Sequence, residues 1–263
     1  MDLLQSVILG SIQGTTEWLP ISSTGNLRVA ERFFGLSVPL LFDVLLHAAT
    51  LLVTLIYFRS AIKAVLLALW HGNFLSEHGK LILPIIVGSI ITGVMGVLIG
   101  NWLDEYFGSL QWLGVWFIIS GALLLSTKFA KEKTDKITLP AAVFIGIMQG
   151  LAVIPSASRS GFTIAAMLLL GVKRELAFKF SFLLSIPAVA GALGLTLYQE
   201  HGVLATFGIG ITEVAAALIV GVAVSFAALK LLEKTLAAKK FWLFSIYCYV
   251  IGAVVLALGV MGY

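Results

Sequence analysis

Six long runs of apolar residues constrain this 263-residue chain more than any other feature of its sequence. A helix needs about 20 largely apolar residues to cross the ~30 Å hydrocarbon layer of a bilayer. Apolar residues make up 60 % of the chain and charged residues only 11 %, whereas about 25 % of the residues in soluble proteins are charged. The sequence therefore predicts an all-α polytopic membrane protein, with spans at about 40–58, 81–100, 110–127, 178–198, 211–229 and 241–260.

Two further pairs of apolar runs are too short to cross a bilayer. The first pair flanks the polar segment QGTTEWLPISSTGNL, and the second pair flanks QGLAVIPSASRSGFT. Two short helices joined by a polar turn predict a re-entrant hairpin, which bilayers tolerate only where the turn is buried in protein or lines a cavity. We expect these hairpins at residues 2–35 and 138–171, and a short surface helix at 64–70.

The two hairpins match each other when the sequence is shifted by 136 residues. Glycines and polar residues are scarce in membrane segments, so their coincidence indicates an internal duplication. Each half would contain one hairpin and three crossings, and an odd number of crossings inserts the second half upside down. We expect repeats at 1–127 and 138–263, joined by a linker at 128–137. The matched pairs are Gly10/Gly146, Gln13/Gln149, Gly14/Gly150, Ser22/Ser158, Thr24/Ser160, Gly25/Gly161, Gly35/Gly171 and Phe42/Phe178.

The basic residues predict the orientation of the chain, because cytoplasmic loops are enriched in Lys and Arg. In this topology one face receives 14 of the 17 basic residues, and Arg28, Arg32 and Arg159 belong to the hairpins. The opposite face receives acids such as Asp104, Glu105 and Glu200. We therefore expect a protein of the inner membrane with both termini outside. The 14 cytoplasmic residues are Arg59, Lys63, Lys80, Lys128, Lys131, Lys133, Lys136, Lys173, Arg174, Lys179, Lys230, Lys234, Lys239 and Lys240.

The same distribution argues against a nucleic-acid partner, although the net charge is +4. The charges follow the loops of one membrane face, which reports topology. No cleavable signal peptide is evident at the start of the chain. The single cysteine, Cys248, lies in the last apolar run, where we expect it to pack as an inert residue without an intrachain disulfide.

Arg159 is the most informative single residue, because an arginine within an apolar segment costs about 2.5–3.5 kcal/mol to insert and usually marks a functional site. It stands between Ser158 and Ser160, before the apolar run 164–170. We expect these serines to cap the N-terminus of a helix. A helix N-terminus and a guanidinium together favour a phosphate ligand. The sequence thus predicts an anion site at membrane depth.

The first hairpin supplies the complementary groups. Gln13 and Glu17 are four residues apart and share a helix face if the helix extends that far. Their oxygens are suited to Mg²⁺ or Ca²⁺ together with substrate oxygens. A metal-bridged diphosphate would reconcile Glu17 with an anion. The polar residues of the two turns are Gln13, Glu17, Ser22, Ser23, Thr24 and Asn26, and Gln149, Ser156, Ser158, Arg159, Ser160 and Thr163.

Several of these residues also have structural interpretations. Ser and Thr in membrane helices often bond their own backbone or a neighbouring helix, and Glu17 could be a capping carboxylate. His47 is interpreted first as a helix-packing residue, with a supporting or proton-relay role as the alternative. Asp43, Glu175 and Glu213 are interpreted as interfacial, and Arg28, Glu31 and Arg32 as an outer rim that attracts a phosphate headgroup.

At these residues the chain resembles the undecaprenyl-diphosphate phosphatases, the bacitracin-resistance family of membrane enzymes. That family has an (E/Q)xxxE motif, here Gln13 to Glu17, then P-x-S-S-T-G-H, here Pro20 to Asn26. Its second motif, P-G-x-S-R-S-x-x-T, corresponds to Pro155 to Thr163. The resemblance covers the whole chain. It implies hydrolysis of a C55 polyprenyl diphosphate to the monophosphate carrier of cell-wall synthesis, with a divalent cation and a site open to the outer face.

The predicted site follows from these motifs. We expect Glu17, Ser23 and Arg159 to be catalytic, with Ser23 or a water activated by Glu17 as the nucleophile. Glu17 and Gln13 are the expected ligands of Mg²⁺ or Ca²⁺. The expected substrate-binding residues are Gln13, Ser22, Thr24, Asn26, Ser158, Ser160 and Thr163.

Two residues depart from the family motifs. Ser156 replaces a glycine, which is a mild change if the backbone angle stays allowed, and Asn26 replaces a histidine. Asparagine cannot accept a proton near neutral pH, so a general base at this position is lost. Either Glu17 takes over that work or catalysis is weak.

These departures leave other functions open. One is a polyprenyl-phosphate flippase with weak or no phosphatase activity, because inverted repeats with broken helices are typical of transporters. The other is a lipid-binding scaffold. For the assembly, we expect a homodimer.

Overall fold

The computed structural model describes residues 1–107, 109–199 and 209–262, and all longer elements within these ranges are helices. Asp104, Glu105 and Glu200, which were expected on the external face, lie outside the described residues and side chains. The helices are α1 (Leu3–Thr16), α2 (Ser23–Phe34), α3 (Leu40–Tyr57), α4 (Arg59–Trp70), α5 (Ile82–Phe107), α6 (Leu110–Ser126), α7 (Leu139–Leu151), α8 (Arg159–Leu169), α9 (Arg174–Gln199), α10 (Ile211–Ala237) and α11 (Phe244–Val260).

Five helical segments in the described ranges are long and apolar enough to cross a bilayer. A sixth is added if α3 and α4, which bend by 75° at Phe58, are taken as one span. This confirms an all-α, polytopic membrane protein. The five segments are Gly79–Ile99, Leu110–Phe129, Arg174–Tyr198, Ile211–Ala237 and Phe241–Val260.

The boundaries correct the sequence-based expectations in several places. α5 continues to Phe107, beyond the expected end at 100, and α9 begins at Arg174 rather than at 178. The helix expected at 64–70 begins at Arg59, directly after α3, because the chain bends without a loop. The span expected at 211–229 continues to Ala237, since its lysines and Glu233 are good helix formers. The helix expected from residue 164 begins at Arg159, because Ser158 caps it by accepting a hydrogen bond from Gly161 N–H. Ser160 therefore lies inside the first turn rather than before it.

The four short helices occur where the broken apolar runs predicted them. Starting residues are 136 apart in each pair, since α1 and α7 begin at Leu3 and Leu139 and α2 and α8 at Ser23 and Arg159. Ser22 caps α2 as Ser158 caps α8. Glycines with positive φ, Gly35 at 63° and Gly171 at 82°, follow the ends of α2 and α8. A left-handed residue is the usual end of a helix, and glycine adopts it without strain.

Each first helix of a hairpin packs closely against a long helix from the other half of the chain. α1 contacts α10, and α7 contacts α5. A Cβ atom at Gly10 would lie 2.8 Å from Ala217 Cα, and one at Gly146 would lie 3.0 Å from Gly88 Cα. Small residues at four-residue spacing allow helix backbones to approach this closely in membranes. Gly10 and Gly146 are therefore packing residues.

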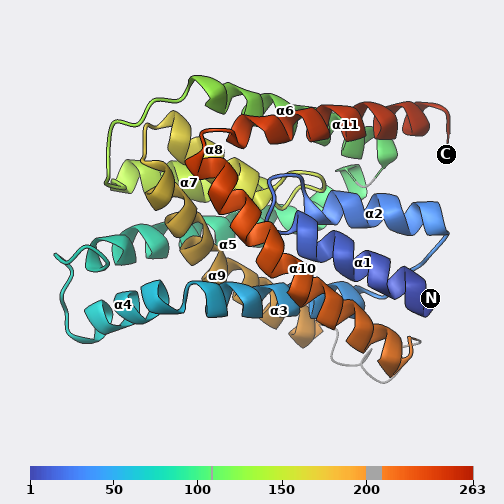
Figure 1. Cartoon of the computed structure of the whole chain (residues 1–263), viewed down its shortest axis with the longest axis horizontal. Coiled ribbons are helices and arrows are strands. Elements are labelled where there is room, and N and C mark those ends of the chain that lie inside the picture. Colours follow the sequence, from blue (N-terminus) through green and yellow to red (C-terminus); the bar gives the residue numbers. More distant parts are fainter. Residues whose placement is uncertain (108, 200–208, 263) are drawn as a thin grey trace.

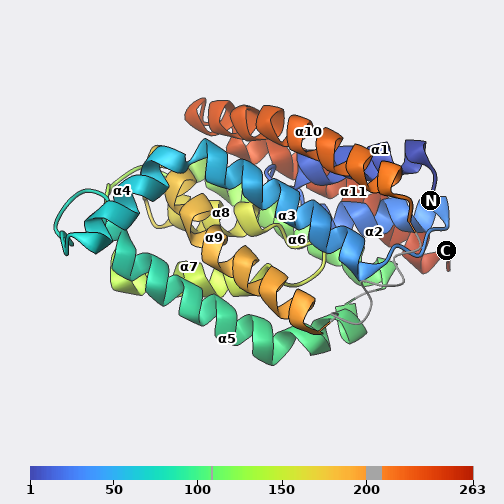
Figure 2. The ribbon, with the colours of Figure 1, turned by 90° about the horizontal axis from the view of Figure 1, so that it is seen from below.

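The helices form an elongated bundle in which both chain termini lie at one end (Figures 1 and 2). Helix α4 lies at the opposite end, and α1 and α2 lie towards the end with the termini (Figures 1 and 2). A buried cluster beside the hairpin turns joins Trp18 and Phe182, whose ring centroids are 5.4 Å apart, with Phe58 and Phe178. This packing holds the first turn against α9.

Replacing Gly10 with alanine tests the close contact of α1 with α10. The added methyl group forces the two backbones apart, so Gly10→Ala should lower stability by about 1–3 kcal/mol, although alanine is intrinsically the better helix former by up to about 1 kcal/mol. The measurement is the thermal unfolding midpoint of the purified protein in detergent. Gly93→Ala is the matched control, because a Cβ there meets nothing within 4 Å. Equal midpoints for the two variants would contradict the packing.

Candidate functional site

The turns of the two hairpins meet at an ion pair between Glu17 and Arg159. Arg159 Nη2 donates to Glu17 Oε1 at 2.6 Å, although the two residues are separated by 142 positions. The Glu17 side chain is 7 % exposed and that of Arg159 is 15 % exposed. Ser160 Oγ, one residue on, donates to Trp18 O at 3.0 Å. These contacts place the two turns face to face.

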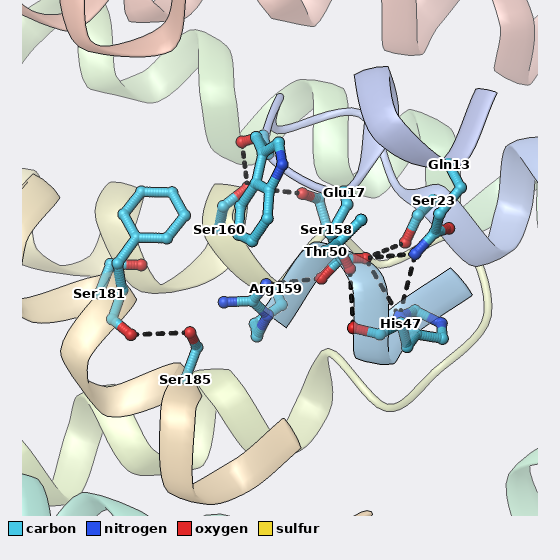
Figure 3. A network of polar contacts seen from close by, with 12 residues as sticks. Gln13, Glu17, Ser23, His47, Thr50, Ser158, Arg159, Ser160, Ser181 and Ser185 are labelled. Atoms are coloured by element: carbon cyan, nitrogen blue, oxygen red, sulfur yellow. Dashed lines mark hydrogen bonds and ion pairs between the residues drawn. The ribbon is translucent and has the colours of Figure 1, made fainter. Parts of the chain in front are cut away.

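The second oxygen of Glu17 gathers three other polar side chains (Figure 3). Ser23 Oγ donates to Glu17 Oε2 at 2.7 Å. Gln13 Nε2 lies 3.3 Å from the same oxygen, and His47 Nδ1 lies 3.4 Å from it. Gln13 Nε2 and His47 Nδ1 are also 3.1 Å apart. One carboxylate thus connects α1, α2, α3 and α8.

A cavity of about 560 Å³ opens beside this cluster. Its polar wall contains Glu17, Ser23, Thr24 and Arg159 and continues to Arg28, Glu31 and Asp43. Its apolar wall comes from α9, through Val189, Ala192 and Leu193, and from other segments, through residues such as Leu27, Val44 and Val153. A cavity with one polar and one apolar wall is suited to an amphipathic ligand.

The N-termini of α2 and α8 both border this cavity. Ser22 and Ser158, the two capping residues, line it together with Ser23 and Arg159, the first residue of each helix. Each cap satisfies one backbone amide, that of Gly25 or Gly161. Helix N-termini carry further amides without intrahelical partners and a partial positive charge. Two of them beside a guanidinium make an anion site.

One terminal nitrogen of the Arg159 guanidinium has no hydrogen-bond partner among the described residues. This nitrogen is the buried Nη1, whereas Nη2 donates to Glu17. The guanidinium carbon lies 6.0 Å from the centroid of the Trp18 ring, which restricts its position. A buried guanidinium nitrogen without a partner is costly, so an anionic oxygen in the cavity would satisfy it.

A scan against family models matches residues 6–254 to "Bacitracin resistance protein BacA". The chain belongs to the BacA family. Among curated proteins it is similar to the undecaprenyl-diphosphatase of Desulforapulum autotrophicum, at 38 % identity covering 98 % of this chain and 99 % of that protein. The undecaprenyl-diphosphatase of Carboxydothermus hydrogenoformans is 38 % identical, with 100 % and 99 % covered. That of Korarchaeum cryptofilum is 37 % identical, with 98 % and 100 % covered.

Asn26, at the position of the BacA-family histidine, does not line the cavity. Its Nδ2 donates to Ile21 O and Ser22 O, both at 2.7 Å. Its Oδ1 accepts from the Tyr247 hydroxyl on α11. All of these contacts hold the turn before α2 in place, so the structure gives Asn26 a scaffolding position.

Ser156, at the position of the BacA-family glycine, keeps a backbone conformation that favours glycine. Its φ is +69°, in the left-handed region. Its buried hydroxyl has no partner among the described residues. Its carbonyl accepts from Ser120 Oγ at 3.2 Å, which helps to hold the strained turn.

Three other expected substrate-binding residues lie behind the cavity wall. Thr163 Oγ1 bonds Arg159 O at 2.8 Å and Ser181 Oγ at 2.6 Å. Ser160 bonds Trp18, and the Gln13 side chain bonds Glu17 and His47 and no other side chain in the described part of the chain. These residues hold those that line the cavity, whereas Glu17, Ser22, Ser23, Thr24, Ser158 and Arg159 line it directly.

For His47, the structure favours a supporting role at the site over helix packing, which was the first interpretation of the sequence. The side chain is 30 % exposed, lines the cavity and lies against Glu17. Arg28, Glu31 and Asp43 also line the cavity. The four-residue spacing of Asp43 and His47 on a helix was the one sequence signal that they share a face.

The polar cluster fits a divalent cation in part. No group of three or more His, Cys, Asp or Glu residues in the described ranges has the geometry of a metal site. However, Gln13 Oε1 is buried without a hydrogen-bond partner in those ranges, beside the carboxylate of Glu17. An amide oxygen and a carboxylate suit Mg²⁺ or Ca²⁺ when phosphate supplies further oxygens.

Substituting Asn26 tests its scaffolding position. Asn26→Leu removes the Nδ2 partner of Ile21 O and the partner of the Tyr247 hydroxyl, whereas Ser22 O keeps its bond from the backbone N–H of residue 26. A buried carbonyl left unsatisfied costs about 1–3 kcal/mol. We expect a lower thermal unfolding midpoint in detergent. Tyr247→Phe removes only one of the contacts and should lower the midpoint less. A midpoint unchanged in both variants would contradict the assignment.

Proposed function

We propose that the chain hydrolyses undecaprenyl diphosphate to the monophosphate, the lipid carrier of cell-wall synthesis, and so contributes to bacitracin resistance. Membership of the BacA family and similarity to curated undecaprenyl-diphosphatases support the proposal. The observation that carries it is the array of Ser23, Glu17 and Arg159 on the wall of an amphipathic cavity.

The proposed substrate fits both walls of the cavity. Its diphosphate would bind the amides at the N-termini of α2 and α8, with Arg159 Nη1 on a phosphoryl oxygen. The first isoprene units would lie along Val189, Ala192 and Leu193. Ser22, Thr24 and Ser158 would contact the phosphate from the polar wall, whereas Gln13, Asn26, Ser160 and Thr163 would act by holding it.

The proposed reaction uses Ser23 as the nucleophile and Glu17 as its base. Ser23 Oγ already donates its proton towards Glu17 Oε2, which meets the requirement for an adjacent base. As Ser23 Oγ attacks the terminal phosphorus, its proton passes to Glu17 and the bond to the bridging oxygen breaks. Undecaprenyl monophosphate leaves, and water then hydrolyses the phosphoserine to release phosphate. Arg159 stabilises the charge on the phosphoryl oxygens in both steps.

A divalent cation, Mg²⁺ or Ca²⁺, held by Glu17 and Gln13 would supply further charge neutralisation at the diphosphate. Attack by a water activated by Glu17, without a phosphoserine, is the alternative chemistry for the same residues. Because the Asn26 side chain bonds the turn before α2 and Tyr247, Glu17 takes the role of base that the family histidine would have offered.

We also propose an inverted duplication with the repeats 1–127 and 138–263 and the linker 128–137. The matched starts of the hairpin helices and the reciprocal pairing of α1 with α10 and α7 with α5 support it. The orientation we propose has both termini outside and the basic loops in the cytoplasm. Its support is the clustering of the linker with other basic segments, for example through the ion pair of Lys173 with Asp135.

The activity is tested by phosphate release from undecaprenyl diphosphate with Mg²⁺ or Ca²⁺. Glu17→Gln should lower turnover by about 10²- to 10⁴-fold because the base is lost, and Arg159→Ala by about 10²- to 10³-fold because charge stabilisation is lost. Ser11→Ala is the control, since within the described residues the Ser11 hydroxyl bonds Val7 O on its own helix and no other group. Turnover near that of the wild type in both site variants would overturn the proposal.

Ser23→Ala separates the two nucleophiles. A loss comparable to that of Glu17→Gln supports Ser23, whereas a small loss supports direct attack by water. If the wild-type protein binds the lipid without releasing phosphate and moves it between liposome leaflets, the transport function replaces hydrolysis.

The orientation is tested with single added cysteines and a membrane-impermeant maleimide. Cys248 is fully buried and provides a low background. Met261→Cys, at an exposed position near the C-terminus, should be labelled in intact spheroplasts. Lys131→Cys, at an exposed position in the linker, should be labelled only after permeabilisation. The reverse pattern would contradict the proposed topology.

A further inference from the structure

Three polar atoms beside the cavity form a nearly equilateral triangle. Glu17 Oε2, His47 Nδ1 and Gln13 Nε2 are separated by 3.4, 3.1 and 3.3 Å. An octahedral cation with ligands at about 2.1 Å places neighbouring ligand atoms about 3 Å apart. The triangle therefore has nearly the dimensions of one face of a metal coordination octahedron.

We propose that His47 is a third protein ligand of the divalent cation, together with Glu17 and Gln13. As a consequence, the site prefers a transition-metal cation of the Mn²⁺ type over Ca²⁺. This inference rests on the proposed function for its setting, since the cation would share the cavity with the diphosphate.

The imidazole of His47 is oriented for this role. Its Nδ1 faces both Gln13 Nε2 and Glu17 Oε2 (Figure 3). Where Gln13 Nε2 donates to Nδ1, that nitrogen carries a lone pair and the ring proton lies on Nε2. This tautomer is the one that binds a metal through Nδ1. Thr50 Oγ1 bonds His47 O at 2.9 Å, which ties the neighbouring helix turn.

Gln13 can present its oxygen to the same position. Its Nε2 now bonds Glu17 and His47, while its buried Oε1 has no hydrogen-bond partner in the described ranges. A cation would occupy the lone pairs that these two bonds use. A half-turn of the amide then brings the oxygen to the cation, and amide oxygen is an accepted ligand of divalent ions.

The remaining contacts of Glu17 are compatible with a bound cation. Arg159 bonds Oε1, whereas the triangle uses Oε2. A carboxylate oxygen has two lone-pair sites, so Oε2 can accept from Ser23 and also bind an ion. The positions opposite the protein ligands would be free for phosphoryl oxygens. Imidazole favours transition metals, whereas Ca²⁺ prefers oxygen ligands only, so one nitrogen in three shifts the preference.

The test is pulsed electron paramagnetic resonance of Mn²⁺ bound to protein containing ¹⁵N-histidine. The full-length protein is purified in detergent through a tag without histidine. We expect a ¹⁵N hyperfine coupling from a directly bound imidazole in the wild type. His47→Gln should lose the coupling and weaken Mn²⁺ binding relative to Ca²⁺ by about tenfold or more. His71→Gln is the matched control, because His71 is exposed at the end of α4, and it should keep the coupling.

Each result decides the proposal. A ¹⁵N coupling that persists in His47→Gln, an all-oxygen environment in the wild type, or no bound Mn²⁺ would overturn it. Phosphate release is measured on the same samples. Hydrolysis without the nitrogen coupling would refute the ligand assignment and leave the proposed function intact. Nitrogen coordination without hydrolysis of the prenyl diphosphate would support the ligand assignment and refute the proposed function.

Discussion

The ion pair of Glu17 with Arg159 is the interaction on which the rest of the site depends. Both charges lie in a chain that is mostly apolar, and each neutralises the other at a contact of 2.6 Å. Removing one partner of a buried pair typically costs about 3–5 kcal/mol, because the other charge is left without compensation. The pair also joins the two hairpin turns, so the contact that makes the charges tolerable also brings the functional side chains of both turns together.

The pair can form only because the turns are held rigidly from behind. Close packing of α1 on α10 and of α7 on α5 fixes the first helix of each hairpin. Serine caps fix the start of each second helix, and Asn26 ties one turn to α11 through Tyr247. Three hydroxyls of the sequence motifs, those of Ser156, Ser160 and Thr163, do not line the cavity, whereas those of Ser22, Ser23, Thr24 and Ser158 do. A motif residue can be essential without touching a substrate.

The cavity explains how one site can treat a lipid and its headgroup differently. Its polar wall combines two helix N-termini, a carboxylate and a guanidinium nitrogen that has no partner among the described residues, whereas α9 contributes apolar side chains to the lining. The charged part of an amphipathic ligand would therefore lie against the polar wall, because the apolar wall offers no group that compensates its charge. In the proposed function, specificity for a phosphate ester of a lipid would follow from this division rather than from any single residue.

The sequence by itself determined the helical membrane class and the hairpin helices, and it indicated Glu17, Ser23 and Arg159 as candidate site residues. These follow from apolar run length and from the insertion cost of a buried arginine, which are local properties. Only the tertiary structure decided that Asn26 supports a turn, that Thr163 bonds Ser181, and that His47 meets Glu17 from a third helix. Such contacts join residues that are far apart in the chain, and they depend on how helices rotate and approach one another. A sequence motif specifies the chemical groups, whereas packing decides which of them face the cavity.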